Sequence, residues 1–159
     1  MMGTGNTMAI ITEVIGMSMP GNSSTPGRSQ EMQELAKAAG KQVMKLYAKK
    51  ITARQIITKE SITNAIKTCM AIGGSGIEMN FSHIYAAAIS EIPLLVGVRP
   101  NGPYNMDQYA KAGGTQAILH ELRKHLDTNC MSVNEKTIGE NISGNEILAP
   151  SIIHHLSNP

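Results

Sequence analysis

Aromatic side chains are scarce in this 159-residue chain, where they make up 3% of the residues and tryptophan is absent. Ile, Leu, Met and Ala must therefore fill the core, and 11 methionines predict an adaptable interior. So few rings argue against a protein that stacks on bases, as does a formal net charge of only +2. We therefore expect no nucleic-acid partner.

Long apolar runs are also missing, and the N-terminus lacks a basic region followed by an apolar one. The sequence thus predicts no membrane partner and no secretory signal. Cysteine is limited to Cys69 and Cys130, which form no CxxC pair. Two isolated thiols favour a reducing compartment over a disulfide. The length suits one domain or part of a larger one.

The stretch "GTGNT", residues 3–7, predicts the start of a helix. Thr4, Asn6 or Thr7 would be its N-cap, and it would run to about Met17. The exposed amides of such a turn also suit an anion, but the Lys of a phosphate-binding loop is missing. Both interpretations stay open, and the turn by itself favours capping. "MPGNSSTPG" then breaks the helix.

Two more helices are predicted before residue 76. Ser29 is a good N-cap for the first of them, and its lysines are expected on a solvated face. The next helix begins near Thr58 and ends at "GGSG", which is equally consistent with a ligand-binding turn. Cys69 is expected to be a small core residue in that helix and not a nucleophile. The apolar positions at helical spacing are Met32, Leu35, Ala36, Ala39, Val43, Leu46 and Tyr47, then Ile62, Ala65, Ile66, Cys69 and Ile72.

The second half of the chain alternates helical patterns with short apolar runs. "SHIYAAAISE" predicts a helix, "PLLVGV" and "CMSV" predict short strands, and "NEILAPSIIHHLSNP" predicts a loop. Thr115 is expected to cap a helix whose residues Ile118, Leu119, Leu122 and Leu126 point inward. Helices alternating with a few short strands indicate part of an α/β layer architecture, with an incomplete sheet.

The ionisable side chains indicate no particular reaction. Neighbouring side chains diverge on a helix or strand, so His154 with His155, and His120 with Glu121, are poor metal pairs. His83 stands among apolar residues, where a hydrogen-bonded, partly buried histidine is expected. The carboxylates without a visible partner carboxylate are Asp107 and Glu135.

Read in order, these stretches resemble the dihydroxy-acid dehydratase and phosphogluconate (sugar-acid) dehydratase family. In that family a Cys, two variable residues and Met lead into Thr-x-Asn-Thr-Met, which Met2, Thr4, Asn6, Thr7 and Met8 match. Further similar runs are "IITKESITNAI", "MAIGGS", "IPLLVGVRPNGPYNMDQYAKAGGTQAIL", "CMSVNEKTIGENI" and "IIHHLSNP". Together they cover nearly the whole chain, and the dihydroxy-acid branch is the nearer one.

The resemblance implies that residues 1–159 are the helix-rich part of a three-layer α/β/α N-terminal domain, with the C-terminal barrel domain absent. A cluster-binding Cys is expected just upstream of Met1. Thr4, Asn6 and Thr7 would then lie near an iron–sulfur cluster, whose sulfides accept backbone N–H groups.

The same resemblance implies an enzyme that converts a small 2,3-dihydroxy acid into a 2-oxo acid in branched-chain amino-acid biosynthesis. In the family, an iron of a [2Fe–2S] or [4Fe–4S] cluster acts on the departing hydroxyl, Mg²⁺ holds the carboxylate end and a serine removes the proton. Cys69 and Cys130 match no cluster ligand. No residue here inherits a catalytic or metal-binding role, so this chain alone is expected to bind neither cofactor.

Two alternatives accompany this interpretation: a sugar-acid (aldonate) dehydratase, and a catalytically inert partial domain. A homodimer is implied for the full-length enzyme, in the cytoplasm or, in a eukaryote, in the mitochondrial or plastid matrix, with no targeting segment visible. "MMGTGNTM" is expected to be poorly anchored, because its natural contacts would be missing.

The chain departs from the family pattern at four points. Residues 76–77 are Gly-Ile where the family has Thr-Asn, and the stretch from there to Pro93 is shorter than in the family. "SHIYAAA" matches only loosely, which leaves a role for His83 open. Residues 134–135, Asn-Glu, replace Thr-Gly. These changes fit a partial or altered gene product.

Overall fold

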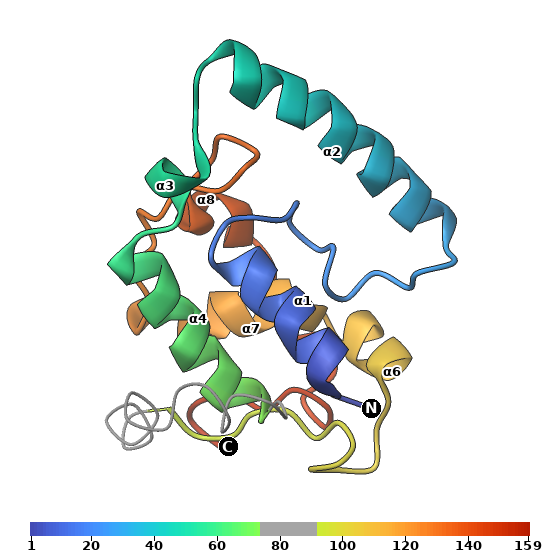
Figure 1. Ribbon diagram of the computed structural model, residues 1–159. Helices are drawn as coiled ribbons and strands as arrows, with labels where there is room; N and C mark the ends of the chain where they lie inside the picture. The colour runs from blue at the N-terminus through green and yellow to red at the C-terminus, as the bar shows by residue number, and fades with distance from the viewer. Residues whose placement is uncertain (74–91) are drawn as a thin grey trace.

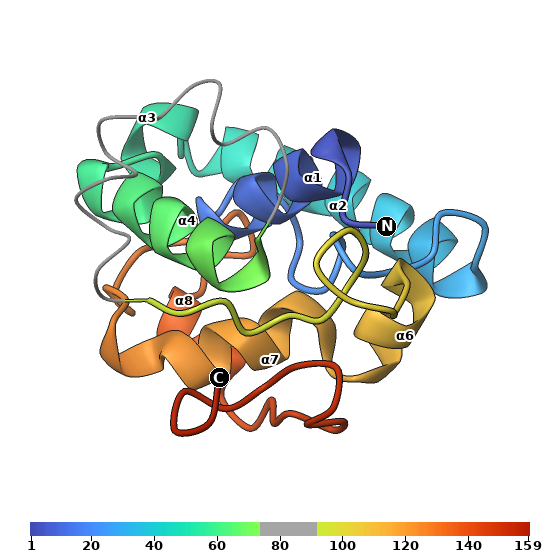
Figure 2. The ribbon, with the colours of Figure 1, turned by 90° about the horizontal axis from the view of Figure 1, so that it is seen from below.

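A computed structural model describes residues 1–73 and 92–159, and there the chain forms helices joined by long loops. α1 packs along α4, while α6, α7 and α8 form a second layer behind them (Figure 1, Figure 2). The helices are α1 Thr4–Val14, α2 Gln30–Ala48, α3 Ala53–Ile56, α4 Lys59–Ile72, α6 Met106–Lys111, α7 Gly114–Glu121, the 3₁₀ helix η1 Leu122–Lys124 and α8 Ile138–Ile142. None of them combines the length and apolar character needed to cross a bilayer.

Two of the predicted helix starts are confirmed. The hydroxyl of Ser29 accepts the Met32 N–H at the start of α2, and Thr58 caps α4 in the same way. Gly73 then ends α4 in the left-handed conformation, with φ of 58°. α1 also forms as predicted, but its N-cap is Gly3, and no side chain caps it. The three proposed cap residues are therefore inside the helix.

The N-terminal turn is firmly held, so the prediction that "MMGTGNTM" is poorly anchored is wrong. Met2 is completely buried, and its amide donates to the Arg99 carbonyl over 2.6 Å. Thr7 is buried as well, and its hydroxyl donates to the Gly3 carbonyl over 3.1 Å. The loop around Arg99 therefore holds the N-terminal turn, a role that the sequence suggested for a segment upstream of Met1.

The core between the two layers consists mainly of aliphatic side chains, as the composition predicts. Cys69 is 2% exposed, and burial raises its pKa to about 12, which confirms it as a core residue. Of the predicted stripe on α4, Ile62 is the exception, because it is 39% exposed. The inward positions predicted on α7 and beyond it are confirmed as buried: Ile118, Leu119, Leu122 and Leu126.

The two predicted strands are extended segments that form isolated bridges. Residues 95–98 run between the end of α4 and the C-terminal tail, where the Gly97 amide donates to the Ile152 carbonyl over 3.0 Å. Within the described ranges no ladder develops, so the layered α/β/α sheet is not observed and the fold is helix-rich. The predicted helix at "SHIYAAAISE", with His83, lies outside these ranges. The bridges join Val96 to Ile153, Val98 to Tyr104, Met131 to Thr137 and His155 to Asn158.

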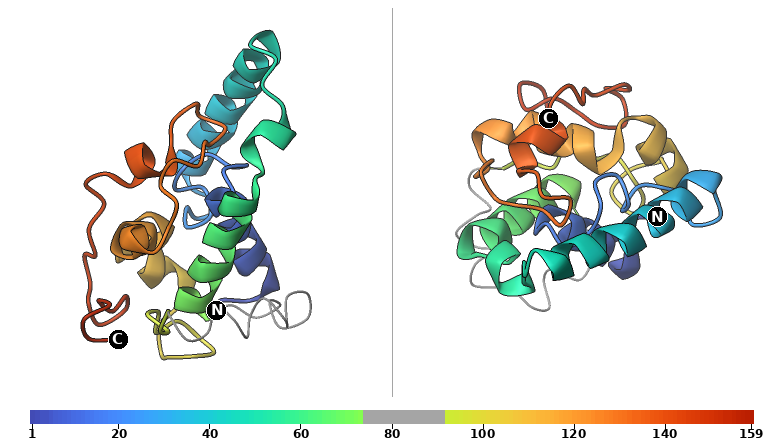
Figure 3. Two further views of the ribbon diagram at one scale, coloured as in Figure 1. Left: turned by 90° about the vertical axis from the view of Figure 1, so that its left-hand side faces the viewer. Right: turned by 90° about the horizontal axis from the view of Figure 1, so that it is seen from above.

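Helix α2 projects from the rest of the molecule and packs only sparsely on the other described helices (Figure 3). Val43, Met44 and Tyr47 are 60%, 63% and 80% exposed. A groove of about 260 Å³ lies between α2 and residues 17–22. The apolar spacing thus predicted the helix correctly, but a large part of its apolar face is open.

The end of α1 meets a loop from the far end of the chain. Gly16 has φ of 86°, and its carbonyl accepts the Val133 N–H over 2.7 Å. A Cβ at this position would lie 2.4 Å from the Met131 carbonyl oxygen. Both the conformation and the crowding therefore require glycine.

Candidate functional site

A polar cavity of about 230 Å³ lies beside the first turn of α1. Asn6 forms part of its wall, together with residues 23–27 and the start of α6 at Met106 and Asp107. The structure therefore places Asn6, which the family resemblance singles out, at the same cavity as the stretch "SSTPG", residues 23–27. From the sequence, that stretch was interpreted only as a helix break.

The three residues expected near a cluster have different surroundings. Thr4 is exposed, and Thr7 is buried under the turn. Asn6 is partly buried, and its Nδ2 donates to the Met1 carbonyl over 2.9 Å. Of the three, Asn6 is the one that lines the cavity.

A buried carboxylate on α1 holds the loop that forms the cavity wall. Glu13 is 5% exposed, and its two oxygens accept the N–H groups of Gly21 and Ser23, both over 2.8 Å. Gln116 on α7 donates its Nε2 to the same carboxylate over 2.5 Å. Such charge-assisted bonds are what a buried carboxylate requires. They connect the first helix, the loop and the second layer.

A second polar chain joins the same loop to the core. The Ser23 hydroxyl lies 2.7 Å from that of Thr115, which lies 3.1 Å from the Tyr109 hydroxyl. Burial raises the pKa of Tyr109, so this hydroxyl stays protonated at neutral pH. Thr115 is therefore a buried link, and the prediction that it caps α7 is wrong. The N-cap of α7 is Gly113.

The residues described by the structure do not fit an iron–sulfur cluster or a magnesium ion. Cys69 lies among Ile11, Ile15 and other aliphatic side chains, and burial raises the pKa of both Cys69 and Cys130. Both cysteines are free thiols. In residues 1–73 and 92–159, no three His, Cys, Asp or Glu side chains come together as metal ligands.

The other ionisable residues singled out in the sequence have structural contacts. The His155 ring lies 3.1 Å from the Glu121 carboxylate, and the His120 ring lies 2.9 Å from the Ile142 carbonyl. Asp107 pairs with Lys111, one turn further along α6. The second to fourth residues of "GGSG" lie outside the described part of the chain.

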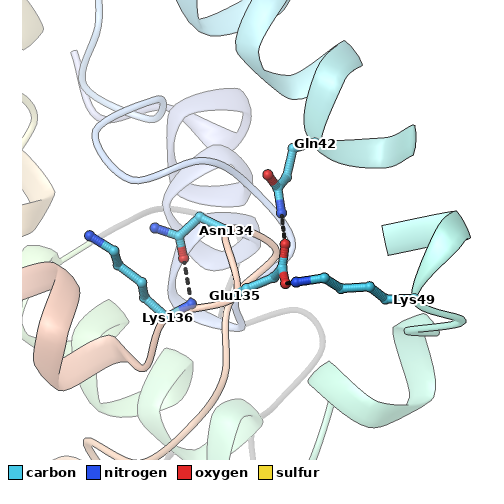
Figure 4. Close-up of polar contacts among 5 residues, drawn as sticks. All are labelled: Gln42, Lys49, Asn134, Glu135 and Lys136. Carbon is cyan, nitrogen blue, oxygen red and sulfur yellow. Dashed lines mark hydrogen bonds and ion pairs between the residues drawn. The ribbon is translucent and has the colours of Figure 1, made fainter. Parts of the chain in front are cut away.

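Glu135, at one departure from the family pattern, connects α2 to the body of the molecule (Figure 4). Its carboxylate accepts a hydrogen bond from Gln42 Nε2 over 3.0 Å and forms an ion pair with Lys49. These contacts lower the pKa of Glu135. Its φ of 67° is in the left-handed region, which explains why glycine suits this position in the family pattern.

Sequence comparison places this chain among known proteins. The family described as "Dihydroxy-acid/6-phosphogluconate dehydratase N-terminal" matches residues 1–141. The chain belongs to this dehydratase family. The predicted resemblance is therefore confirmed.

Relatives of the dehydratase family match nearly all of this chain. It is 38% identical to a dihydroxy-acid dehydratase of Desulfatibacillum aliphaticivorans over an alignment of 172 positions, which covers 98% of this chain and 31% of that protein. It is 39% identical to one of Agathobacter rectalis, with the same two coverages. For one of Methanosarcina barkeri the identity is 33%, over 94% of this chain and 29% of the relative. The chain thus spans about 30% of the length of these dehydratases.

The comparison with the first of these dehydratases extends over 172 residues, whereas this chain has 159. The alignment must therefore include positions that this chain lacks. That agrees with the predicted shortening, although its place before Pro93 stays a prediction.

Proposed function

We propose that residues 1–159 form part of the N-terminal domain of a dihydroxy-acid dehydratase, a hydro-lyase of branched-chain amino-acid biosynthesis. The observation that supports this is the match of 94–98% of the chain to dihydroxy-acid dehydratases of three organisms. The reaction removes the hydroxyl at C3 and the hydrogen at C2 of a 2,3-dihydroxy acid as water. The enol that remains becomes a 2-oxo acid. The barrel domain belongs to the part of the enzyme outside these residues.

In this proposal the chain shapes a wall of the substrate site. Asn6, Ser24 and Thr25 line a cavity whose amide- and hydroxyl-bearing side chains suit the hydroxyl groups of a small dihydroxy acid. Thr4, Asn6 and Thr7 lie on the side of the iron–sulfur cluster. The ligands of the cluster and of magnesium are placed in other parts of the enzyme, as the family resemblance implies.

Direct binding tests this use of the cavity. In a titration of the ¹⁵N-labelled chain with 2,3-dihydroxyisovalerate, we expect shifts of the amide signals of Asn6, Ser24 and Thr25. Isovalerate, which lacks both hydroxyls, is the control and should leave these signals unchanged. Equal shifts with both compounds would show that the cavity does not recognise hydroxyl groups. An Asn145→Ala variant, with its substitution at a residue that does not line the cavity, should bind like the unaltered chain.

A sugar-acid dehydratase is the alternative within the family, because a hydroxyl-lined cavity also suits a longer polyol. A full-length version of the protein should turn over dihydroxyisovalerate in preference to arabinonate. A wide preference for arabinonate would exclude the first proposal and support the second.

An inert partial domain is the expected state of this chain by itself. Iron and acid-labile sulfide assays on the purified chain should find neither, and dihydroxyisovalerate should not be consumed. Stoichiometric iron and sulfide in the pure chain would contradict the placement of all cluster ligands elsewhere.

The proposal includes a homodimer for the full-length enzyme, and a location in the cytoplasm or in the matrix of a mitochondrion or plastid. Both follow from the family resemblance. Sedimentation of the full-length protein and fractionation of its source cells would test them.

A further inference from the structure

The bonds of Glu13 deepen the proposed function and depend on it for the identity of the ligand. We propose that Glu13 is a positioning residue, which fixes the loop of residues 21–27 as the hydroxyl-bearing wall of the cavity beside Asn6. Glu13 does not line that cavity itself, so it acts through the loop.

Helix α1 is connected to two parts of the cavity lining. Asn6 and Glu13 are seven residues apart on α1, which is two turns of helix, so they lie on the same face. Asn6 lines the cavity directly, and Glu13 binds the loop whose residues 23–27 also line it. Both parts of the lining are therefore attached to a single helix.

Gly21 connects the carboxylate of Glu13 to the hydroxyls of the loop. Glu13 holds the Gly21 N–H, and the carbonyl of Gly21 accepts the hydroxyls of Ser24 over 3.3 Å and of Thr25 over 2.8 Å. The hydrogen of each hydroxyl is thereby engaged in a hydrogen bond, and its oxygen can still accept a hydrogen bond from a ligand. The wall thus offers acceptors, which suit the hydroxyl groups of a ligand better than its carboxylate.

Helix α7, in the second layer, contacts the same loop. Ser23 bonds to Thr115, and a Cβ at Gly114 would lie 2.5 Å from the Ser24 hydroxyl oxygen. Gln116 completes the clamp by donating to Glu13. The loop is consequently fixed between α1 and α7 before any ligand arrives.

Trypsin cleavage after the exposed Arg28 reports on this loop. Glu13→Ala should increase the rate of cleavage at Arg28 at least tenfold and weaken the binding of 2,3-dihydroxyisovalerate at least fivefold. The control is Ile118→Val, a core change on α7 that lowers stability without touching the loop. If Ile118→Val has the same effects, Glu13 is merely structural and the inference is overturned.

An exchange of side chains gives a sharper test and a milder change. Glu13→Gln combined with Gln116→Glu keeps a hydrogen-bonded pair between α1 and α7, but it places an amide nitrogen against the loop N–H groups. We expect trypsin to cleave this double variant at Arg28 as fast as it cleaves Glu13→Ala. Cleavage at the rate of the unaltered chain would show that the carboxylate at residue 13 is not what holds the loop.

The two proposals fail in different ways. If the unaltered chain does not bind dihydroxyisovalerate, but Glu13→Ala is cleaved rapidly, the proposed ligand is wrong and the positioning role is supported. If the Arg28 bond stays protected in both Glu13 variants, the positioning role is overturned, whatever the cavity binds.

Discussion

Glu135 and Lys49 form an ion pair between positions 86 residues apart in the chain. Gln42 donates to the same carboxylate, so one side chain receives two bonds from α2. Since α2 packs only sparsely on the other described helices, this contact is a main polar link between α2 and the body of the molecule. It comes from a position where the family pattern has glycine.

Glu135→Gly should loosen α2 without unfolding the protein. Glycine relieves the left-handed conformation but removes both contacts to α2, so the two effects on global stability oppose each other. We expect a nearly unchanged melting temperature and several-fold faster amide hydrogen exchange in residues 42–48. The control is Lys136→Ala, the neighbouring position with an exposed side chain. Unchanged exchange in α2 would show that Glu135 does not hold this helix.

Acid should release the C-terminal tail. Burial would raise the pKa of Glu121, but bonds from the Leu156 N–H and the His155 ring outweigh it, so the pKa lies below its ordinary value of 4.5. The stabilisation is therefore present above pH 4.5 and is lost as the pH falls through the lowered pKa. The Leu156 amide should lose protection from exchange in that range. In Glu121→Gln the tail should show no such acid dependence, and a persistent dependence would point to another group.

Alkaline pH should destabilise the fold through Cys69. Its pKa is raised from 9.0 to about 12, so the unfolded chain ionises first. The stabilisation is complete below pH 9 and is lost as the pH rises from there towards 12. Cys69→Ala should make the unfolding free energy fall less steeply with pH in this range, where Tyr109 and Cys130, whose pKa values are also raised, still contribute. The thiol should also resist a thiol reagent at pH 8 in the folded protein, and rapid reaction there would contradict its burial.

Asn64→Ala should lower the free energy of unfolding by about 3 kcal/mol, because it leaves buried polar groups unpaired. Asn64 is 1% exposed, and its amide pairs with both backbone groups of Asp127, over 2.8 and 2.9 Å. The control is Thr63→Ala, on the exposed side of α4, which should cost less than about 0.5 kcal/mol. Urea unfolding of both variants makes the comparison, and equal losses would contradict the special role of Asn64.

The helix starts that the sequence predicted correctly depend on residues close together in the chain. Ser29 and Thr58 could be identified as caps because their partners lie three residues away. The same signal was overlooked at Asn105 and Thr137, whose capping boxes start the short helices α6 and α8. Those two helices were therefore predictable in principle, although neither was predicted.

Long-range contacts account for what was missed. Thr115 follows a glycine pair and looks like a cap, yet its hydroxyl is drawn into the core by Ser23, 92 residues earlier. Glu13 has no neighbour in sequence that indicates a buried carboxylate, since its partners lie on a loop and on α7. Extended segments such as 95–98 have strand-like composition, but strands need partners, and here they find single bridges. The candidate cavity depends on these same distant contacts.

The crowding at Gly16 has a consequence for biosynthesis. The end of α1 is completed by backbone contacts with residues 131–133, which are translated more than 110 residues after it. Until residues 131–133 have been translated, α1 lacks the contacts at its C-terminal end. The apolar interface between α1 and α4 is therefore incompletely packed during that time. Chains stalled before Met131 should therefore depend on chaperones more than chains released after it.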